Sequence, residues 1–170
     1  MQEVFFMKKR WLNAARLLGS ILICQFAGLL GSVFTTSGSL GWYNDLFKPD
    51  FTPPDWVFAP VWTILYTLMG ISLYLVWNQG LNKPMIRTSL IFFGVQLGLN
   101  VLWTLVFFGL HFITGGLIVI ILLWIAIFTT IFIFSVISRA ATILLLPYIA
   151  WVTYAAYLNF EIWRLNVWEY

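Results

Sequence analysis

The chain has 170 residues, of which 62% are hydrophobic and 9% are charged, and its formal net charge is +3. An average soluble domain is about 25% charged. The composition therefore excludes a water-facing surface of ordinary polarity and indicates an integral membrane protein. The basic residues flank apolar segments and form no patch of the kind that binds nucleic acid, so nucleic acid is not an expected partner.

Five apolar segments are each close to the ~20 residues that a membrane-spanning helix requires. The sequence therefore predicts an all-α integral membrane protein, in which residues 1–170 form a single domain, a five-helix transmembrane bundle. Glycine and proline mark short turns between helices, whereas the first connection is predicted to be a long loop. The predicted helices cover residues 12–34, 56–79, 86–110, 114–137 and 140–165, and the loop covers residues 35–55.

The distribution of lysine and arginine predicts the orientation of the chain. With five spans, the N-terminus lies on the same side as the second and fourth connections, and this side holds seven of the nine basic residues. Basic residues concentrate on the cytoplasmic side of a membrane. We therefore expect a cytoplasmic N-terminus in a bacterial membrane, with a mitochondrial membrane as the alternative. The seven residues are Lys8, Lys9, Arg10, Arg16, Lys83, Arg87 and Arg139.

The first connection ends in the segment KPDFTPPDWVFAPVW, Lys48–Trp62. Pro49, Pro53 and Pro54 fix the backbone φ angle and remove N–H donors, so the segment loses little conformational entropy when it becomes ordered. We interpret it as a preorganised lid over an apolar pocket. The alternative is a structural cap that covers no ligand. Asp55 is predicted to cap the second helix.

Polar and aromatic side chains form a stripe on each of three helices, because residues three or four apart share one helix face. At about 1.5 Å per residue, the stripes reach similar depths in the outer half of the membrane, beneath the lid. They predict an apolar pocket with few polar groups. The alternatives are aromatic packing in the core and amide hydrogen bonds between helices. The stripes are Trp62 and Tyr66; Gln96, Asn100 and Trp103; and Trp151, Ala155 and Asn159.

Two further features have ordinary explanations beside functional ones. His111 is the only histidine, and it could bind a haem iron axially or be a polar residue of the turn between the third and fourth helices. Gly94 and Gly98 form a GxxxG step, which fits either a dimer seam or packing within the chain. No Cys/His spacing typical of a metal site is present, so no metal is expected.

Three blocks of the sequence resemble the tryptophan-rich sensory protein / translocator protein family (TspO/MBR, the peripheral benzodiazepine receptors). They are WYNDLFKPDFTPPDWVFAPVW at 42–62, QLGLNVLW at 96–103 and PYIAWVTYAAYLNFEIWRLN at 147–166. The resemblance implies a five-helix membrane protein, usually a homodimer. It also implies a pocket that binds porphyrins, haem-like tetrapyrroles, isoquinoline or benzodiazepine drugs and, in some members, sterols.

The resemblance implies ligand contacts at Tyr43, Trp62, Asn100, Trp103, Trp151 and Ala155. With Phe58, Tyr66, Gln96 and Leu158, these residues make up the candidate ligand-binding set.

The sequence departs from the family pattern at three positions. Phe51 replaces the usual tryptophan of the lid, and Val119 stands where the fourth helix often carries an acid. Phe160 stands where the sterol-recognition pattern requires a tyrosine before a basic residue, here Arg164. The strict pattern therefore fails, and sterol is a doubtful ligand.

The sequence predicts a receptor or sensor that binds porphyrin as a ligand, with no resident cofactor. Two alternatives remain: a light-dependent porphyrin-degrading enzyme, with Trp62 and Trp151 as its candidate catalytic pair, and a transporter of tetrapyrroles or sterols. Against an enzyme, the stripes contain no acid–base pair, activated nucleophile or metal site. Against a transporter, the spans contain no charged relay and no internal repeat.

Overall fold

The computed structural model of the chain describes residues 2–35 and 37–168. Within these ranges all regular elements are helices, and five of them are long and apolar enough to cross a membrane. The predicted all-α bundle of five membrane-spanning helices is therefore confirmed. The elements are α1 Gln2–Ser32, α2 Ser37–Asp45, α3 Asp55–Trp77, α4 Pro84–Thr104, η1 Leu105–Gly109, α5 Ile113–Ser135, α6 Arg139–Trp163 and η2 Arg164–Trp168, the two η elements being π-helical turns.

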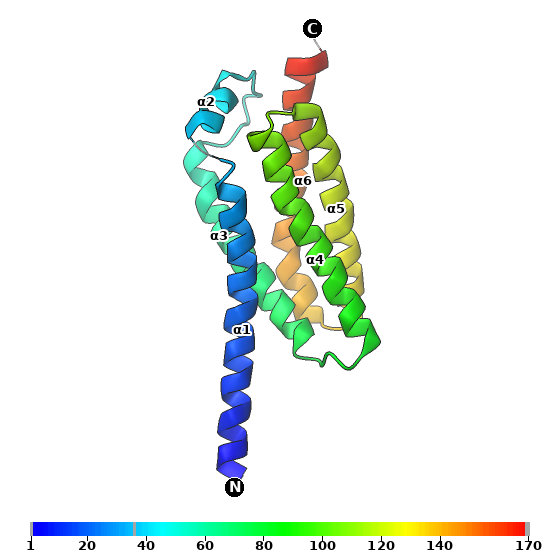
Figure 1. The fold of residues 1–170 in the computed structure, drawn as a ribbon. Coiled ribbons are helices and arrows are strands. Elements are labelled where there is room, and N and C mark those ends of the chain that lie inside the picture. Colours follow the sequence, from blue (N-terminus) through cyan, green and yellow to red (C-terminus); the bar gives the residue numbers. More distant parts are fainter. Residues whose placement is uncertain (1, 36, 169–170) are drawn as a thin grey trace.

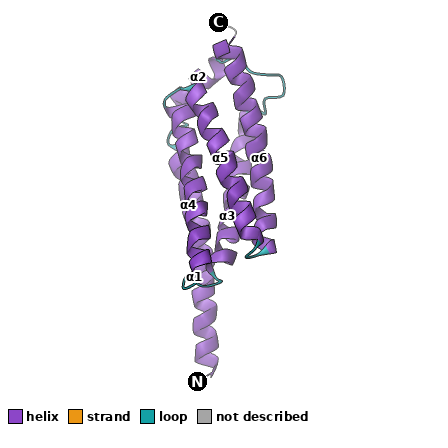
Figure 2. Ribbon diagram, turned by 90° about the vertical axis from the view of Figure 1, so that its right-hand side faces the viewer, coloured by secondary structure: helices purple, strands orange, loops and turns teal. Residues whose placement is uncertain are grey.

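The five long helices pack side by side in the order α1, α3, α6, α5 and α4, and α4 returns to contact α1. Figures 1 and 2 show α2 and the C-terminus at one end of the bundle and the N-terminus at the other. The first part of α1 extends beyond the ends of the other helices (Figure 1). Each helix therefore covers a neighbour on two sides and exposes its remaining face to lipid.

Helix α1 begins at Gln2, well before the predicted start at residue 12. An apolar segment shows only which part of a helix lies in hydrocarbon. The segment that precedes it contains lysine, arginine, glutamate and methionine, which are all good helix formers, so the helix continues into water. The other four membrane helices begin within two residues of the expected positions, and the third predicted helix, 86–110, is formed by α4 together with η1, which ends at Gly109.

The predicted loop at residues 35–55 is interrupted by a short helix, α2, so the long first loop is absent in the predicted form. Trp42 and Tyr43 of α2 pack against Phe107 of η1, with ring centroids 5.7 and 6.2 Å apart. This packing stabilises a helix that the glycine and serine content of the segment does not predict. Only residues 46–54 remain as a non-helical connection to α3.

Asp55 does not cap α3 in the predicted way. The N-cap residue is Pro54, which makes no side-chain capping bond, and Asp55 is the first residue of the helix itself. A carboxylate in the first turn still interacts favourably with the helix dipole. The Asp55 side chain points toward the lid and is exposed.

Helices α1 and α3 approach closely at Gly70, which is buried in α3. A Cβ atom built on Gly70 would lie 2.5 Å from the Cα atom of Ile21 in α1. Small residues permit such close contact between membrane helices. This crossing fixes how the C-terminal half of α1 faces the N-terminal half of α3.

Helix α4 widens into the π-helical turn η1 near the lid, and η1 is followed by a tight turn into α5. His111 in this turn has a φ angle of 53°, which residues other than glycine adopt infrequently. Short π-helical turns inside longer helices often occur at functional sites. Here η1 directs Phe107 and Phe108 toward α2.

Candidate functional site

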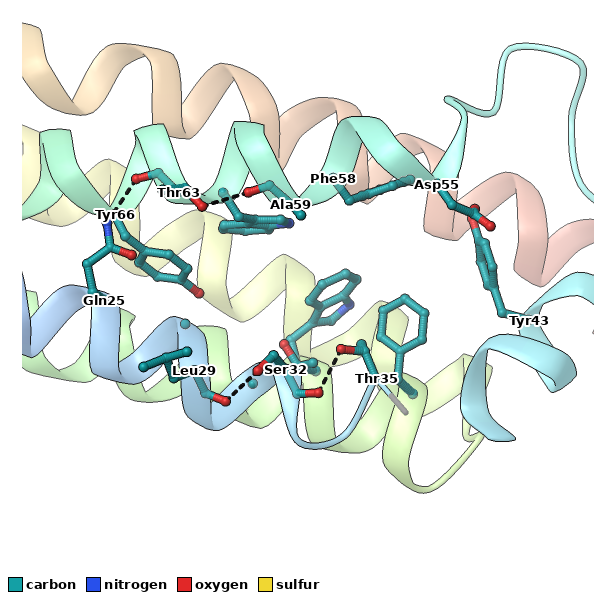
Figure 3. A pocket seen from close by; sticks show the side chains of 16 residues that line it. Gln25, Leu29, Ser32, Thr35, Tyr43, Asp55, Phe58, Ala59, Thr63 and Tyr66 are labelled. Atoms are coloured by element: carbon teal, nitrogen blue, oxygen red, sulfur yellow. Dashed lines mark hydrogen bonds between the residues drawn. The ribbon is translucent and has the colours of Figure 1, made fainter. Parts of the chain in front are cut away.

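A pocket of about 480 Å³ lies between α1, α3 and the α4–η1 junction, with α2 at one end. Figure 3 shows α1 along one wall and α3 along the opposite wall. The volume falls within the ~300–1,000 Å³ that is usual for small-molecule sites. The lining residues are Gln25, Gly28, Leu29, Gly31, Ser32, Thr35, Tyr43, Asp55, Phe58, Ala59, Trp62, Thr63, Tyr66, Trp103, Thr104 and Phe108.

The inner end of the pocket is formed by Tyr66 and by small or polar residues of α1. A Cβ atom on Gly28 would lie 2.5 Å from Cε2 of Tyr66, so the tyrosine ring occupies the space that glycine leaves. Gln25 donates from Nε2 to the Thr63 carbonyl at 3.0 Å and to Thr67 Oγ1 at 2.9 Å (Figure 3 shows Gln25, Thr63 and Tyr66). These bonds join α1 to α3 where the pocket ends.

Six of the sixteen residues that line the pocket are aromatic. The Trp62 and Tyr66 rings of α3 are stacked, with centroids 5.5 Å apart and an interplanar angle of 28°. On the opposite side, Trp103 meets the edge of Phe108, with centroids 5.9 Å apart. Trp103 Nε1 donates to Asn159 Oδ1 at 3.2 Å, which fixes the ring in place. The pocket wall therefore presents indole and phenol rings whose positions are fixed by these contacts.

A buried hydrogen-bond network lies behind Tyr66. The Tyr66 hydroxyl donates to Asn100 Oδ1, Asn100 Nδ2 donates to the Tyr148 hydroxyl at 3.0 Å, and that hydroxyl donates to Gln96 Oε1 at 3.0 Å. Asn100 and Gln96 are each 1% exposed. The network joins α3, α4 and α6, and it orients the Tyr66 hydroxyl at the pocket wall. The side-chain amides of Asn100 and Gln96 therefore make hydrogen bonds between helices and do not line the pocket.

Tyr43 closes the end of the pocket nearest α2. It is 4% exposed and its ring lies 5.6 Å from that of Phe108. The Lys48 Nζ atom lies 4.5 Å from the centroid of the Tyr43 ring, a cation–π contact. Burial, together with the nearby Asp55 carboxylate, raises the pKa of Tyr43 to about 12. The Tyr43 hydroxyl therefore stays neutral at physiological pH.

The lid segment is attached to α6 and η2 at two points. The backbone N–H of Phe47 donates to Asn166 Oδ1 at 3.0 Å, and Asn166 Nδ2 donates to the Phe47 carbonyl at 2.9 Å. The Tyr154 hydroxyl donates to the Phe51 carbonyl at 2.7 Å, and the Phe51 ring stacks on Tyr157 at 5.3 Å. The apolar lid contact expected of Phe51 is thus made to α6.

Five of the ten predicted ligand-binding residues line this pocket and five do not. Trp151 lies next to Phe58, with ring centroids 6.0 Å apart, and is not part of the pocket wall. Ala155 and Leu158 are residues of α6 that are buried in the core. The five that line the pocket are Tyr43, Phe58, Trp62, Tyr66 and Trp103; the five that do not are Gln96, Asn100, Trp151, Ala155 and Leu158.

The stripes predicted from the sequence do not include the pocket residues of α1. A weak signal was present, because Gln25, Gly28, Gly31 and Ser32 are small or polar residues at helical spacing in an otherwise apolar helix. His111 does not line the pocket. Its ring stacks on Trp42, with centroids 4.4 Å apart and an interplanar angle of 14°.

Comparison with known proteins gives matches along most of the chain. The model of the TspO/MBR family matches residues 20–164. The tryptophan-rich protein TspO of Chlorobaculum tepidum is 42% identical over 160 residues, which cover 94% of this chain and 99% of that protein. The tryptophan-rich sensory protein of Cereibacter sphaeroides is 37% identical, with 85% and 91% covered. The translocator protein of Homo sapiens is 35% identical, with 88% and 89% covered.

Proposed function

Because the chain belongs to the TspO/MBR family, we propose that it is a receptor of the sensor type that binds porphyrins, such as haem and protoporphyrin, and related lipophilic molecules in the pocket beside α1 and α3. Family membership and the five apolar helices make the chain an integral multi-pass membrane protein. The name of the Cereibacter sphaeroides relative, a sensory protein, supports a sensing role.

The observation that carries this proposal is an aromatic-walled pocket inside a membrane-spanning bundle. Trp62, Tyr66 and Trp103 present aromatic rings to it, and Tyr43 closes one end. A flat, largely apolar ring system gains both stacking contacts and buried area in such a space. Porphyrin is proposed as a ligand that is bound and released, and sterol is not proposed, because Phe160 breaks the sterol pattern.

A titration of the purified protein with protoporphyrin in darkness tests the proposal. We expect saturable quenching of tryptophan fluorescence, since Trp62 and Trp103 would contact the ligand. Trp62→Phe keeps an aromatic face, so dark affinity should fall by only ~1 kcal/mol or less. A signal that rises linearly with porphyrin and never saturates would contradict binding in the pocket.

Light-dependent porphyrin degradation is the second candidate function, and the position of Trp62 in the pocket wall favours it. Under illumination, Trp62→Phe should slow porphyrin loss more than Trp151→Phe, because Trp151 lies next to Phe58, outside the lining. Trp124→Phe is the control, since Trp124 bonds to Thr153 away from the pocket. Equal rates in all four proteins would assign the loss to free porphyrin and oxygen. Porphyrin flux into liposomes would instead favour transport.

We propose that α2 and residues 46–54 act as the lid over the pocket. Tyr43 lies at the pocket, whereas Phe47 and Phe51 attach the segment to the other side of the bundle through Asn166 and Tyr154. Pro53 and Pro54 restrict the backbone, so the segment loses less conformational entropy when it becomes ordered over the pocket. These attachments hold the segment across the end of the bundle, with Tyr43 at the pocket.

The N-terminus is proposed to be cytoplasmic in a bacterial membrane. The turn between α3 and α4 and the start of α6 lie at the same end of the bundle as the N-terminus, opposite α2 (Figure 1). The single cysteine of the chain, Cys24, is first replaced by serine. We then expect cysteines introduced at Asn82 and at Asp50 to react with a membrane-impermeant thiol reagent from opposite sides. Labelling of both from one side would contradict five spans. Lys8 and Lys9 contribute to the predicted orientation, but the structure does not describe their side chains.

We also propose a homodimer that uses the α4 face around Gly94 and Gly98. A Cβ atom built on either glycine would meet nothing within 4 Å, so this face is open in a single chain. Ile91 and Val95 flank it and are exposed. An open small-residue face suits close approach of a second helix.

A further inference from the structure

The charges along the pocket are unequally distributed. Among its sixteen lining residues, all of them described, Asp55 is the only charged side chain, and no lysine, arginine or histidine is present. The remaining polar groups are neutral hydroxyls, amides and indole N–H groups. The interior therefore offers hydrogen bonds but no positive charge to a ligand.

Asp55 and Tyr43 lie together at the lid end of the pocket (Figure 3). Asp55 is exposed there and is the first residue of α3. Both side chains line this end of the pocket, and the negative charge of Asp55 adds to burial in raising the pKa of Tyr43. Lys48 lies on the Tyr43 ring and donates to Asn44 Oδ1 at 3.4 Å, but it is not part of the lining.

We propose that Asp55 determines the specificity of the pocket by disfavouring ligands that bring carboxylates to its lid end, where the Asp55 side chain is exposed, and favouring ligands whose groups at that end are neutral or cationic. This inference rests on the proposed porphyrin-binding function and narrows its ligand class. Among porphyrins with the same ring, diacids such as protoporphyrin then bind more weakly than their neutral esters or than amine-bearing analogues.

The physical reason follows from where the ligand charges must lie. Burying an ionised carboxylate without a partner is strongly unfavourable, and the inner part of the pocket has no basic group to pair with it. A porphyrin diacid must therefore keep its carboxylates at the lid end, where they approach Asp55. Two like charges a few ångströms apart repel measurably even at a solvated protein surface. An ester of the same porphyrin has no such repulsion.

The experiment compares three probes on the purified wild-type protein and on Asp55→Asn. The probes are protoporphyrin IX, its dimethyl ester, and a diamide whose two arms end in tertiary amines. Asparagine has the shape of aspartate and removes only the charge. We expect Asp55→Asn to raise the affinity for the diacid roughly threefold or more. The affinity for the dimethyl ester should change by no more than about twofold. The affinity for the diamide should fall.

Asp50→Asn is the matched control. Asp50 is an exposed carboxylate of the lid, close in sequence to Asp55, and it does not line the pocket, so its replacement changes the net charge equally. It should leave the ratio of diacid to ester affinity unchanged. Raising the salt concentration should also tighten diacid binding to the wild type but not to Asp55→Asn, because salt screens the repulsion between exposed charges.

The outcomes separate this inference from the function on which it rests. If the dimethyl ester binds saturably but Asp55→Asn and Asp50→Asn shift the diacid-to-ester ratio equally, porphyrin binding stands and the role of Asp55 is overturned. The same holds if neither variant shifts the ratio. If no porphyrin probe binds the wild type saturably, the proposed function itself fails and this inference fails with it.

Discussion

Replacing Gly70 with alanine is expected to force α1 away from α3 and to disrupt the pocket. The new Cβ atom would lie 2.5 Å from Cα and 2.9 Å from the backbone nitrogen of Ile21, and backbone atoms cannot move aside as a flexible side chain can. Overpacking of this kind typically destabilises a protein by ~1–3 kcal/mol. Because α1 carries Gln25 and Gly28 of the pocket wall, we expect ligand affinity to fall about tenfold or more, equivalent to ~1.4 kcal/mol.

Thermal unfolding in detergent and a porphyrin titration measure the two effects of Gly70→Ala. Gly19→Ala is the matched control, because Gly19 lies on α1 and a Cβ there would meet nothing within 4 Å. Alanine is also the better helix former, by ~1 kcal/mol in a helix interior. The control should therefore be neutral or slightly stabilising. Equal stability of the Gly70 and Gly19 variants would show that α1 and α3 need no glycine at their crossing.

Replacing Asn100 with leucine is expected to destabilise the bundle more than any substitution on its lipid-facing surface. Leucine has a similar volume but removes the acceptor for Tyr66 and the donor to Tyr148, so two hydrogen bonds between helices are lost. Leaving a buried polar group without its partner costs ~1–3 kcal/mol, although bonds between membrane helices average nearer ~0.6 kcal/mol. We expect a total loss of about 1–3 kcal/mol within those limits.

A second variant identifies the cause of that loss. In Asn100→Leu combined with Tyr66→Phe, the unpaired Tyr66 hydroxyl is also removed, so part of the stability should return. Thr129→Val is the control, because the Thr129 hydroxyl bonds only to the Ile125 carbonyl of its own helix, at 2.8 Å. Failure of Tyr66→Phe to restore any stability would assign the loss to packing around residue 100 and leave the hydrogen-bond network without a stabilising role.

The candidate site was predicted in part because helix periodicity shows which residues share a face. Trp62, Tyr66 and Trp103 were assigned from spacing and depth, and the structure places all three on the pocket wall. The same reasoning placed Trp151 and Ala155 at the pocket, but they lie outside its lining. Periodicity defines a face of one helix and does not say which neighbouring helix that face meets.

The helix order explains the difference. Helix α3 contacts α1 on one side and α6 on the other, so aromatic residues of α3 and α6 can approach each other without enclosing the pocket. The pocket lies on the α1 side, where Gly28 and Gly31 let Tyr66 and Thr104 approach α1 closely. On the α6 side, Trp151 and Phe58 are in ring contact and Tyr148 packs against Trp62 at 6.3 Å.

The sequence by itself determined that the chain is a membrane protein with five helices, because a 62% hydrophobic chain in five apolar segments has no other stable way to satisfy its backbone in lipid. It also indicated the aromatic character of the site. Tertiary structure alone decided that α2 is a helix and that α1 forms a pocket wall, since both depend on contacts between segments far apart in the chain. Trp42 packs on Phe107, Gly70 meets Ile21, and Asn166 holds Phe47 across 119 positions of the chain.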